Sequence, residues 1–260
     1  MTFETEGFAG RSAAALQAEQ RQRNGELFDF ADKCARLALE IAGRLRAVKN
    51  RRQLVAGAFF ARCVTHFQAA MLLAESGMTL ESLAMSRGLL ETVFVMLAIA
   101  EDAVSPGELA AHDSASRVKH ANTLLNAKDY GNVEPFKEKL QDFSSLHKDS
   151  ATIDMREFAR RGKALAAYDG LYRHLSHHAA HPSLSAVDEY FERHDGGKFS
   201  VQLKPLFAKT PAAVLSAVTG ILLACFACEK CGLSIADTDV KLGQTWSECE
   251  KLDQRYRPWA

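Results

Sequence analysis

The stretch Ala212 to Cys228 decides the fold class: Ala-Ala-Val-Leu-Ser-Ala-Val-Thr-Gly-Ile-Leu-Leu-Ala-Cys-Phe-Ala-Cys. It contains no charged residue. A helix that is apolar on every side lies either in a protein core or in a membrane. Because Ser216, Thr219 and Gly220 dilute the apolar run, we expect a buried helix over residues 211–231 and no membrane span.

The rest of the chain predicts an all-α fold. Apolar residues recur at three- and four-residue spacing, and only six prolines interrupt the 260 residues. Thr79 supplies an N-cap for one helix, and Pro106 suits the first turn of the next. Helices are expected over residues 12–48 with a break near 24–25, and over 53–76, 79–100, 106–125, 133–146, 154–167, 169–180 and 237–252.

One strand signal stands out from this helical pattern. Asp195-Gly196-Gly197 separates two short runs that contain aromatic residues, which predicts a small β-hairpin near 188–203. The sequence shows no internal repeat and no Gly- or Ser-rich linker. We therefore expect a loosely ordered segment over residues 1–23, followed by a single-domain helical bundle over 24–260.

Charge and cysteine content narrow the possible functions. Lys plus Arg and Asp plus Glu number 32 each, so the chain has no net charge with which to bind a polyanion over its whole surface. Contact with nucleic acid would have to be local. The six cysteines and an N-terminus without a signal-peptide pattern predict a cytoplasmic protein with reduced thiols.

The stretch Leu171 to Ser183 concentrates the titratable chemistry, with four of the nine histidines. In an α-helix each residue turns by about 100°, which places all four imidazoles on one face with Arg173 at its edge. Pro182 disfavours helical geometry at the preceding residue, so this helix should end or kink at His181. The four histidines are His174, His177, His178 and His181, and the residues of a separate apolar face are Leu171, Tyr172, Leu175 and Ala179.

Two kinds of chemistry fit this histidine-rich stretch. The i,i+4 pairs of histidines could share a zinc ion, but the sequence shows no second ligand motif, so a metal-dependent hydrolase is the weakest alternative and no cofactor is expected. RNA can also be cleaved without metal, by attack of its own 2′-hydroxyl on the adjacent phosphate. A histidine can move the proton and an arginine can hold the phosphate.

A resemblance supports the second chemistry. Arg173 to His178 matches the Arg-polar-x-x-x-His pattern of the HEPN superfamily, all-helical proteins that include many metal-independent toxin and antiviral ribonucleases. The wider chain, over about residues 50–235, is similar to a group of uncharacterised bacterial HEPN-like proteins. Those proteins carry Tyr-x-x-Leu-Ser followed by His-Pro-Ser, and an Arg-x-x-x-Glu on an earlier apolar helix. The corresponding residues here are Tyr172, Leu175, Ser176, His181, Pro182, Ser183, Arg87 and Glu91.

The resemblance implies a metal-independent endoribonuclease that acts on RNA, of a toxin or phage-defence type. It also implies a homodimer in which two copies form one RNA-binding cleft, and a partner such as an antitoxin protein. In this hypothesis Arg173 binds phosphate and His178 is the general acid/base, with His177 and His181 as alternatives for that role. Glu91 orients a histidine, and the residues that contact the substrate are Tyr172, His174, Ser176 and Arg87.

A non-catalytic reading of the same residues stays open. Arg87 and Glu91 are i,i+4 in a strongly apolar helix, where charges are costly unless paired, so they also fit a structural ion pair. The histidines could likewise be structural, in a helical partner or regulatory protein. The thiols in the Cys225-x-x-Cys-x-x-Cys231 spacing are interpreted as small buried residues, because they lie on the most apolar helix.

Overall fold

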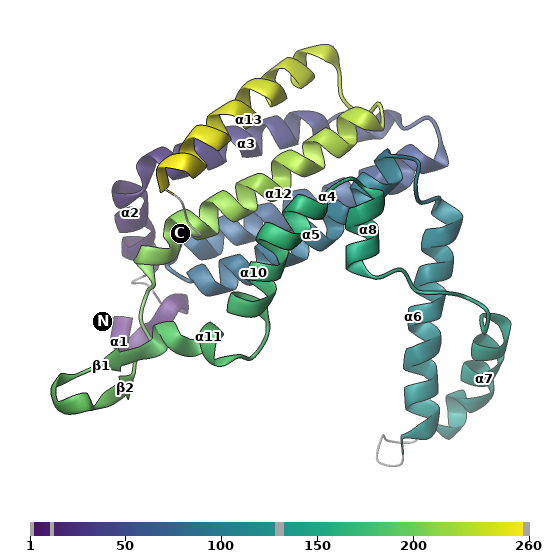
Figure 1. Ribbon diagram of the computed structural model, residues 1–260, viewed down its shortest axis with the longest axis horizontal. Coiled ribbons are helices and arrows are strands. Elements are labelled where there is room, and N and C mark those ends of the chain that lie inside the picture. The colour runs from purple at the N-terminus through teal and green to yellow at the C-terminus, as the bar shows by residue number, and fades with distance from the viewer. Residues whose placement is uncertain (1–2, 11–12, 128–132, 257–260) are drawn as a thin grey trace.

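The computed structural model describes residues 3–10, 13–127 and 133–256. In this part of the chain the protein is a bundle of helices with one two-stranded hairpin (Figure 1), which confirms the predicted all-α fold. The helices are α1 Phe3–Glu6, α2 Ala13–Arg23, α3 Gly25–Ala42, α4 Arg51–Glu75, α5 Thr79–Ala100, α6 Pro106–Asn126, α7 Lys137–Leu146, α8 Met155–Arg161, α9 Leu165–Ala167, α10 Arg173–Leu175, α11 Leu184–Val187, α12 Thr210–Lys230 and α13 Ala236–Tyr256, and the strands are β1 Phe191–Arg193 and β2 Phe199–Val201.

The core is built around the three apolar helices α4, α5 and α12. Helix α12 packs against both of the others, while α3 and α13 cover it from the other side (Figure 1). The approach of α12 to α5 depends on Gly220, since a Cβ there would lie 2.7 Å from Cδ2 of Leu89. The helix predicted from the apolar stretch is therefore present and is buried by its neighbours.

Three helical segments are long and apolar enough to cross a membrane, judged by length and composition alone. They are Arg51–Glu75, Thr79–Ala100 and Phe207–Lys230. In the last of these, 78% of the most apolar window is buried inside the bundle. The apolar surface of this helix is thus mostly used in packing against other helices.

Much of the N-terminal region is helical, as the helix expected from residue 12 implies. Residues 13–23 form helix α2, which ends just before Asn24, where a break was expected. Gln20 is fully buried, and its Nε2 donates hydrogen bonds to Oγ1 of Thr210 at 2.6 Å and to the carbonyl of Ala74 at 3.3 Å. A polar composition hides this anchoring, because the partners lie far away in the sequence.

The helix ends follow local chemistry with one exception. Ser105 and Glu108 form a reciprocal capping box ahead of α6, with Pro106 in its first turn as predicted. The prediction of Thr79 as an N-cap is wrong. Met78 holds that position, and the Thr79 hydroxyl instead donates to the carbonyl of Leu206 at 3.1 Å. A tertiary hydrogen bond has replaced the local one.

Two parts of the chain extend from the bundle (Figure 1). Helices α6 and α7 pack against each other and project away from the core, and α6 buries only Ala115 and Ala121. The hairpin of β1 and β2 is antiparallel, with Phe191 paired to Val201 and Arg193 to Phe199, which confirms the predicted hairpin. Between these two parts, residues 165–187 run across the surface of α5 and form the candidate site.

Candidate active site

The histidine-rich segment is helical but not regularly α-helical. Two π-helical turns, Tyr168–Tyr172 and Ser176–Ala180, flank the short helix α10. The N–H of His181 donates to the Ser176 carbonyl at 3.1 Å, a bond across five residues. Each π turn holds one residue more than an α turn, so side chains beyond it are displaced by about 100°. The single histidine face expected from an α-helix therefore does not extend over the whole segment.

The segment is held on the bundle by its apolar side chains. Leu175 is fully buried and Tyr172 is 8% exposed. The Tyr172 ring lies edge-on to Phe94 of α5, with centroids 5.7 Å apart, and stacks on Tyr168 at 5.0 Å. His181 has extended backbone geometry before Pro182, so the helix ends where the sequence predicts.

On one side, the segment is tied to α5 by four polar side chains, here called the Arg87 cluster: Arg87, Glu91, Tyr172 and Ser176. Arg87 Nε donates to Ser176 Oγ at 2.9 Å, and its Nη2 donates to the Tyr172 hydroxyl at 3.1 Å. The same Nη2 lies 3.1 Å from Glu91 Oε1, which also accepts a hydrogen bond from Tyr172 at 2.9 Å. Each charge in the cluster thus has an opposite charge and hydrogen-bond partners.

These contacts bear on the roles predicted for the cluster. The carboxylate of Glu91 is bonded to Arg87 and Tyr172, not to a histidine. The side chains of Arg87 and Glu91 are only 24% and 33% exposed. Partial burial, together with the hydrogen bond to Glu91, raises the pKa of the Tyr172 phenol. The cluster is therefore a nearly closed polar contact between the segment and α5.

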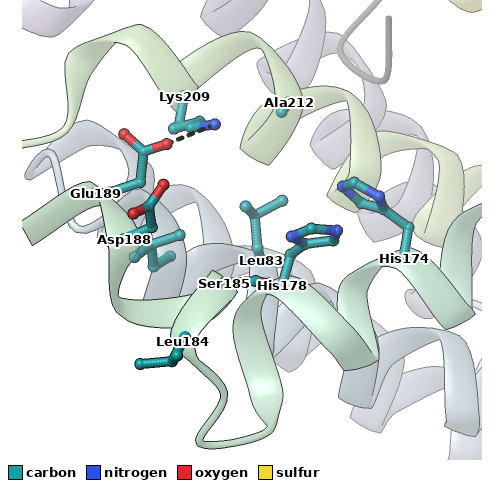
Figure 2. Close-up of a pocket in the computed structure, with 10 residues that line it drawn as sticks. Leu83, His174, His178, Leu184, Ser185, Asp188, Glu189, Lys209 and Ala212 are labelled. Atoms are coloured by element: carbon teal, nitrogen blue, oxygen red, sulfur yellow. Dashed lines mark ion pairs between the residues drawn. The ribbon is translucent and has the colours of Figure 1, made fainter.

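The other side of the segment opens into what we call the histidine pocket (Figure 2). The rings of His174 and His178 lie 4.4 Å apart between centroids and are inclined by 32°. The pocket has a volume of ≈ 570 Å³. Leucine and alanine side chains form an apolar wall, and carboxylate, hydroxyl and ammonium groups form the rim. Besides the two histidines, the lining residues are Leu80, Leu83, Leu184, Ser185, Asp188, Glu189, Lys209 and Ala212.

Burial and neighbouring cationic groups lower the pKa values of both pocket histidines. Partial burial lowers the pKa of His174, and the charges of His178, Lys209 and His177 lower it further. Burial likewise lowers the pKa of His178, followed by the charges of His177 and Lys209. Both shifts favour the neutral imidazole, which is the form that can accept a proton. Lys209 makes an ion pair of 2.8 Å with Glu189, drawn as a dashed line in Figure 2.

The remaining predicted residues lie outside the pocket lining. The Arg173 side chain is 70% exposed and its Nη1 lies 3.9 Å from Oδ1 of Asp169. His177 is exposed beside the pocket, its ring 4.8 Å from that of His178 and its Nε2 3.3 Å from Ser185 Oγ. His181 is also exposed. The structure brings together His174 and His178, but it does not bring Arg173 into the pocket with them.

Several pocket residues could not be found by reading along the sequence. Lys209 lies just before α12, far from the histidines in the chain, and reaches the pocket only through the fold. Ser185, Asp188 and Glu189 follow the His-Pro-Ser turn in α11 and the turn after it. For these residues, the one available signal in the sequence was that the acidic pair Asp188-Glu189 follows the histidines closely.

The cysteines are buried in the core, and the described residues gather no set of metal ligands. Cys225, Cys228 and Cys231 are all buried, and burial raises the pKa of each thiol. Among the described residues, no group of three or more His, Cys, Asp and Glu side chains is placed to hold a metal ion.

The fold and site define an all-helical protein with a histidine-lined surface pocket. The sequence matches the model of a family of unknown function, DUF5677, over residues 53–199, and the chain belongs to this family. The matched region includes the Arg87 cluster and both pocket histidines, but not Lys209. No curated protein and no solved structure matches the chain.

Proposed function

We propose that the protein is a metal-independent endoribonuclease that cleaves RNA in the histidine pocket. The observation that carries this proposal is the pair of neighbouring imidazoles, His174 and His178, in an open pocket that the ammonium of Lys209 also lines. Histidine moves protons near neutral pH, and a lysine ammonium binds phosphate as a point charge. The resemblance of the segment to HEPN ribonucleases points to the same chemistry.

The reaction needs only one proton relay. The neutral imidazole of His178 accepts the proton of a ribose 2′-hydroxyl, and the 2′-oxygen forms a bond to the adjacent phosphorus. The bond from phosphorus to the 5′-oxygen breaks, and its electron pair leaves with that oxygen, which takes the proton back from the imidazolium. The products are a 2′,3′-cyclic phosphate and a free 5′-hydroxyl. Such acid–base assistance contributes about 10²- to 10⁴-fold to a rate.

In this proposal the cationic role belongs to Lys209 and not to Arg173. Lys209 lines the pocket, while Arg173 faces solvent beside Asp169. A phosphate would replace Glu189 as the partner of Lys209, and His174 would donate a hydrogen bond to a phosphate oxygen when it is protonated. The apolar wall of the pocket suits a ribose or base. This arrangement keeps the predicted roles of His178 and His174 and changes the residue that holds the phosphate.

The test is cleavage of a labelled single-stranded RNA by the purified protein in excess EDTA. We expect products with a 2′,3′-cyclic phosphate, and no cleavage at a position where the 2′-hydroxyl is replaced by hydrogen. His178→Ala should abolish cleavage, while His120→Ala, which removes an exposed histidine of α6, should not. If the wild type does not cleave RNA, or if His178→Ala prepared in the same way cleaves equally well, the proposal is wrong.

A second candidate is a non-catalytic helical partner protein, favoured by the separation of Arg173 from the pocket. The projecting pair α6 and α7 would offer a binding arm for such a role (Figure 1). Expression of the wild type beside His178→Ala separates the two candidates, because only a nuclease should degrade cellular RNA and slow growth. Four further expectations stay predictions: the toxin or phage-defence role, the homodimer, the antitoxin-like partner and the cytoplasmic location.

A further inference from the structure

We propose that Arg87 is a positioning residue that clamps both π-helical turns to α5 and so aims His174 and His178 into the histidine pocket. The inference deepens the proposed function, because these histidines are its reactive groups. The clamp concerns only how the histidines are positioned, so it can be tested whether or not the protein cleaves RNA.

The clamp depends on one guanidinium that reaches both π turns. Its Nη2 donates to the hydroxyl of Tyr172, the last residue of the first π turn, and its Nε donates to the hydroxyl of Ser176, the first residue of the second. The guanidinium carbon also lies 5.2 Å from the centroid of the Tyr172 ring. A planar fork can make these contacts together, whereas a lysine ammonium has no such fixed geometry.

Glu91 holds the fork in place from α5. Its Oε1 lies 3.1 Å from Arg87 Nη2 and accepts the Tyr172 hydroxyl at 2.9 Å. Arg87 and Glu91 are i,i+4 on one helix, so α5 alone can hold this pair together. The side chains of Arg87 and Glu91 are only 24% and 33% exposed. Water therefore screens this ion pair less than it screens most other ion pairs of the described residues.

The two anchors alternate with the two pocket histidines along the chain. Tyr172 and Ser176 point to the Arg87 cluster, while His174 and His178 line the pocket. A π turn that relaxed to the commoner α turn would rotate the side chains beyond it by about 100°. If the first turn, Tyr168–Tyr172, relaxed in this way, His174 and His178 would both rotate out of the pocket, so the polar clamp fixes the geometry of the reactive pair.

A direct readout is the pKa of each pocket histidine, measured by NMR titration with signals assigned from single histidine substitutions. The charged groups that face the pair are His177, Lys209, Asp188 and Glu189. In the wild type both pKa values should lie below the usual range. Arg87→Lys retains the charge opposite Glu91 but loses the fork, so the pKa values should rise toward the ordinary value in a folded protein.

Two further variants separate positioning from stability. Ser176→Ala removes only the hydroxyl that accepts from Arg87 Nε, and the histidine pKa values should again rise. Leu242→Ala creates a cavity on α13, away from the segment, and should lower stability but leave both pKa values at the wild-type level. Unchanged pKa values in both Arg87→Lys and Ser176→Ala would overturn the clamp.

RNA cleavage adds a readout that depends on the proposed function. Arg87→Lys should lower kcat with little change in KM and should move the pH optimum in the same direction as the histidine pKa values. If the wild type shows no cleavage while the NMR shifts occur as expected, the clamp stands and the nuclease proposal fails. If cleavage is present but the pKa values do not move, the clamp fails and the nuclease proposal stands.

Discussion

The two sides of the segment 168–180 both carry polar and charged side chains but differ in how far these are closed off from solvent. On the α5 side, the Arg87 cluster joins charge, hydroxyl and aromatic ring into a nearly closed set of contacts. On the other side, the histidine pocket is open and polar at its rim. Side chains whose bonding is satisfied within the protein stabilise it, whereas groups that face an open pocket are placed to meet a ligand. The comparison assigns stability to one side and chemistry to the other.

The largest effect is expected on the pocket side. His178→Ala should lower the single-turnover rate of RNA cleavage by roughly 10²- to 10⁴-fold, because the proton acceptor is lost. The free energy of unfolding in urea should stay within ~0.5 kcal/mol of the wild type, since the residue is only partly buried. A variant that loses stability as strongly as it loses activity would contradict the division between the two sides.

A smaller effect, on stability, is expected on the cluster side. Tyr172→Phe removes the hydroxyl that joins Arg87 and Glu91 and leaves a partly buried carboxylate with fewer donors. We expect a loss of about 1–3 kcal/mol in the free energy of unfolding. Ser185→Ala, the matched loss of an exposed hydroxyl in the pocket, should change it by less than ~0.5 kcal/mol. If the two variants lost equal amounts of unfolding free energy, the proposed difference between the cluster side and the pocket side would be wrong.

The pH dependence of stability should come in part from the pocket. The pKa values of His174 and His178 are lowered in the folded protein, so below about pH 6.5 the unfolded chain binds protons more readily than the folded one. Stability should therefore be complete above the ordinary histidine pKa and fall as pH drops through the folded values. In the double variant His174→Ala, His178→Ala, the urea midpoint of unfolding should change less between pH 7 and pH 5 than in the wild type. If the midpoint changes with pH as much as in the wild type, the pocket histidines are not the source of this pH dependence.

The smallest effect is expected for a residue that lies on neither side. Arg173 is 70% exposed and its ion pair with Asp169 is long, at 3.9 Å. Exposed pairs of this kind contribute about 0–1 kcal/mol. Arg173→Ala should leave the urea midpoint and the histidine pKa values almost unchanged, as measured by the same titrations. A large shift in either would show that Arg173 acts on the pocket after all.

The sequence predicts the fold well because its signals are local. The apolar stretch that became α12, Pro106 in the first turn of α6 and the Gly-rich hairpin turn each act over a few residues. The chain also shows which segment carries the histidines, and the structure places two of them in the pocket. Local patterns were sufficient for these features.

The details of the site depend on contacts that no local pattern carries. The π turns change which side chains share a face, and they are held in part by Arg87 from another helix. Glu91 finds Tyr172 as its partner only after the segment docks on α5. Lys209 reaches the histidines through the path of the chain around the bundle. Such pairings follow from tertiary packing, so spacing alone could not distinguish them.

The central claim is that the pocket, and not the exposed Arg173, carries the chemistry. It is tested most directly by the single-turnover rates of RNA cleavage for Lys209→Ala and Arg173→Ala, measured side by side in EDTA. We expect Lys209→Ala to be slowed by roughly 10²-fold, as for loss of one charged contact to the transition state, and Arg173→Ala to match the wild type. Loss of cleavage in Arg173→Ala with full activity in Lys209→Ala would contradict this account of the site.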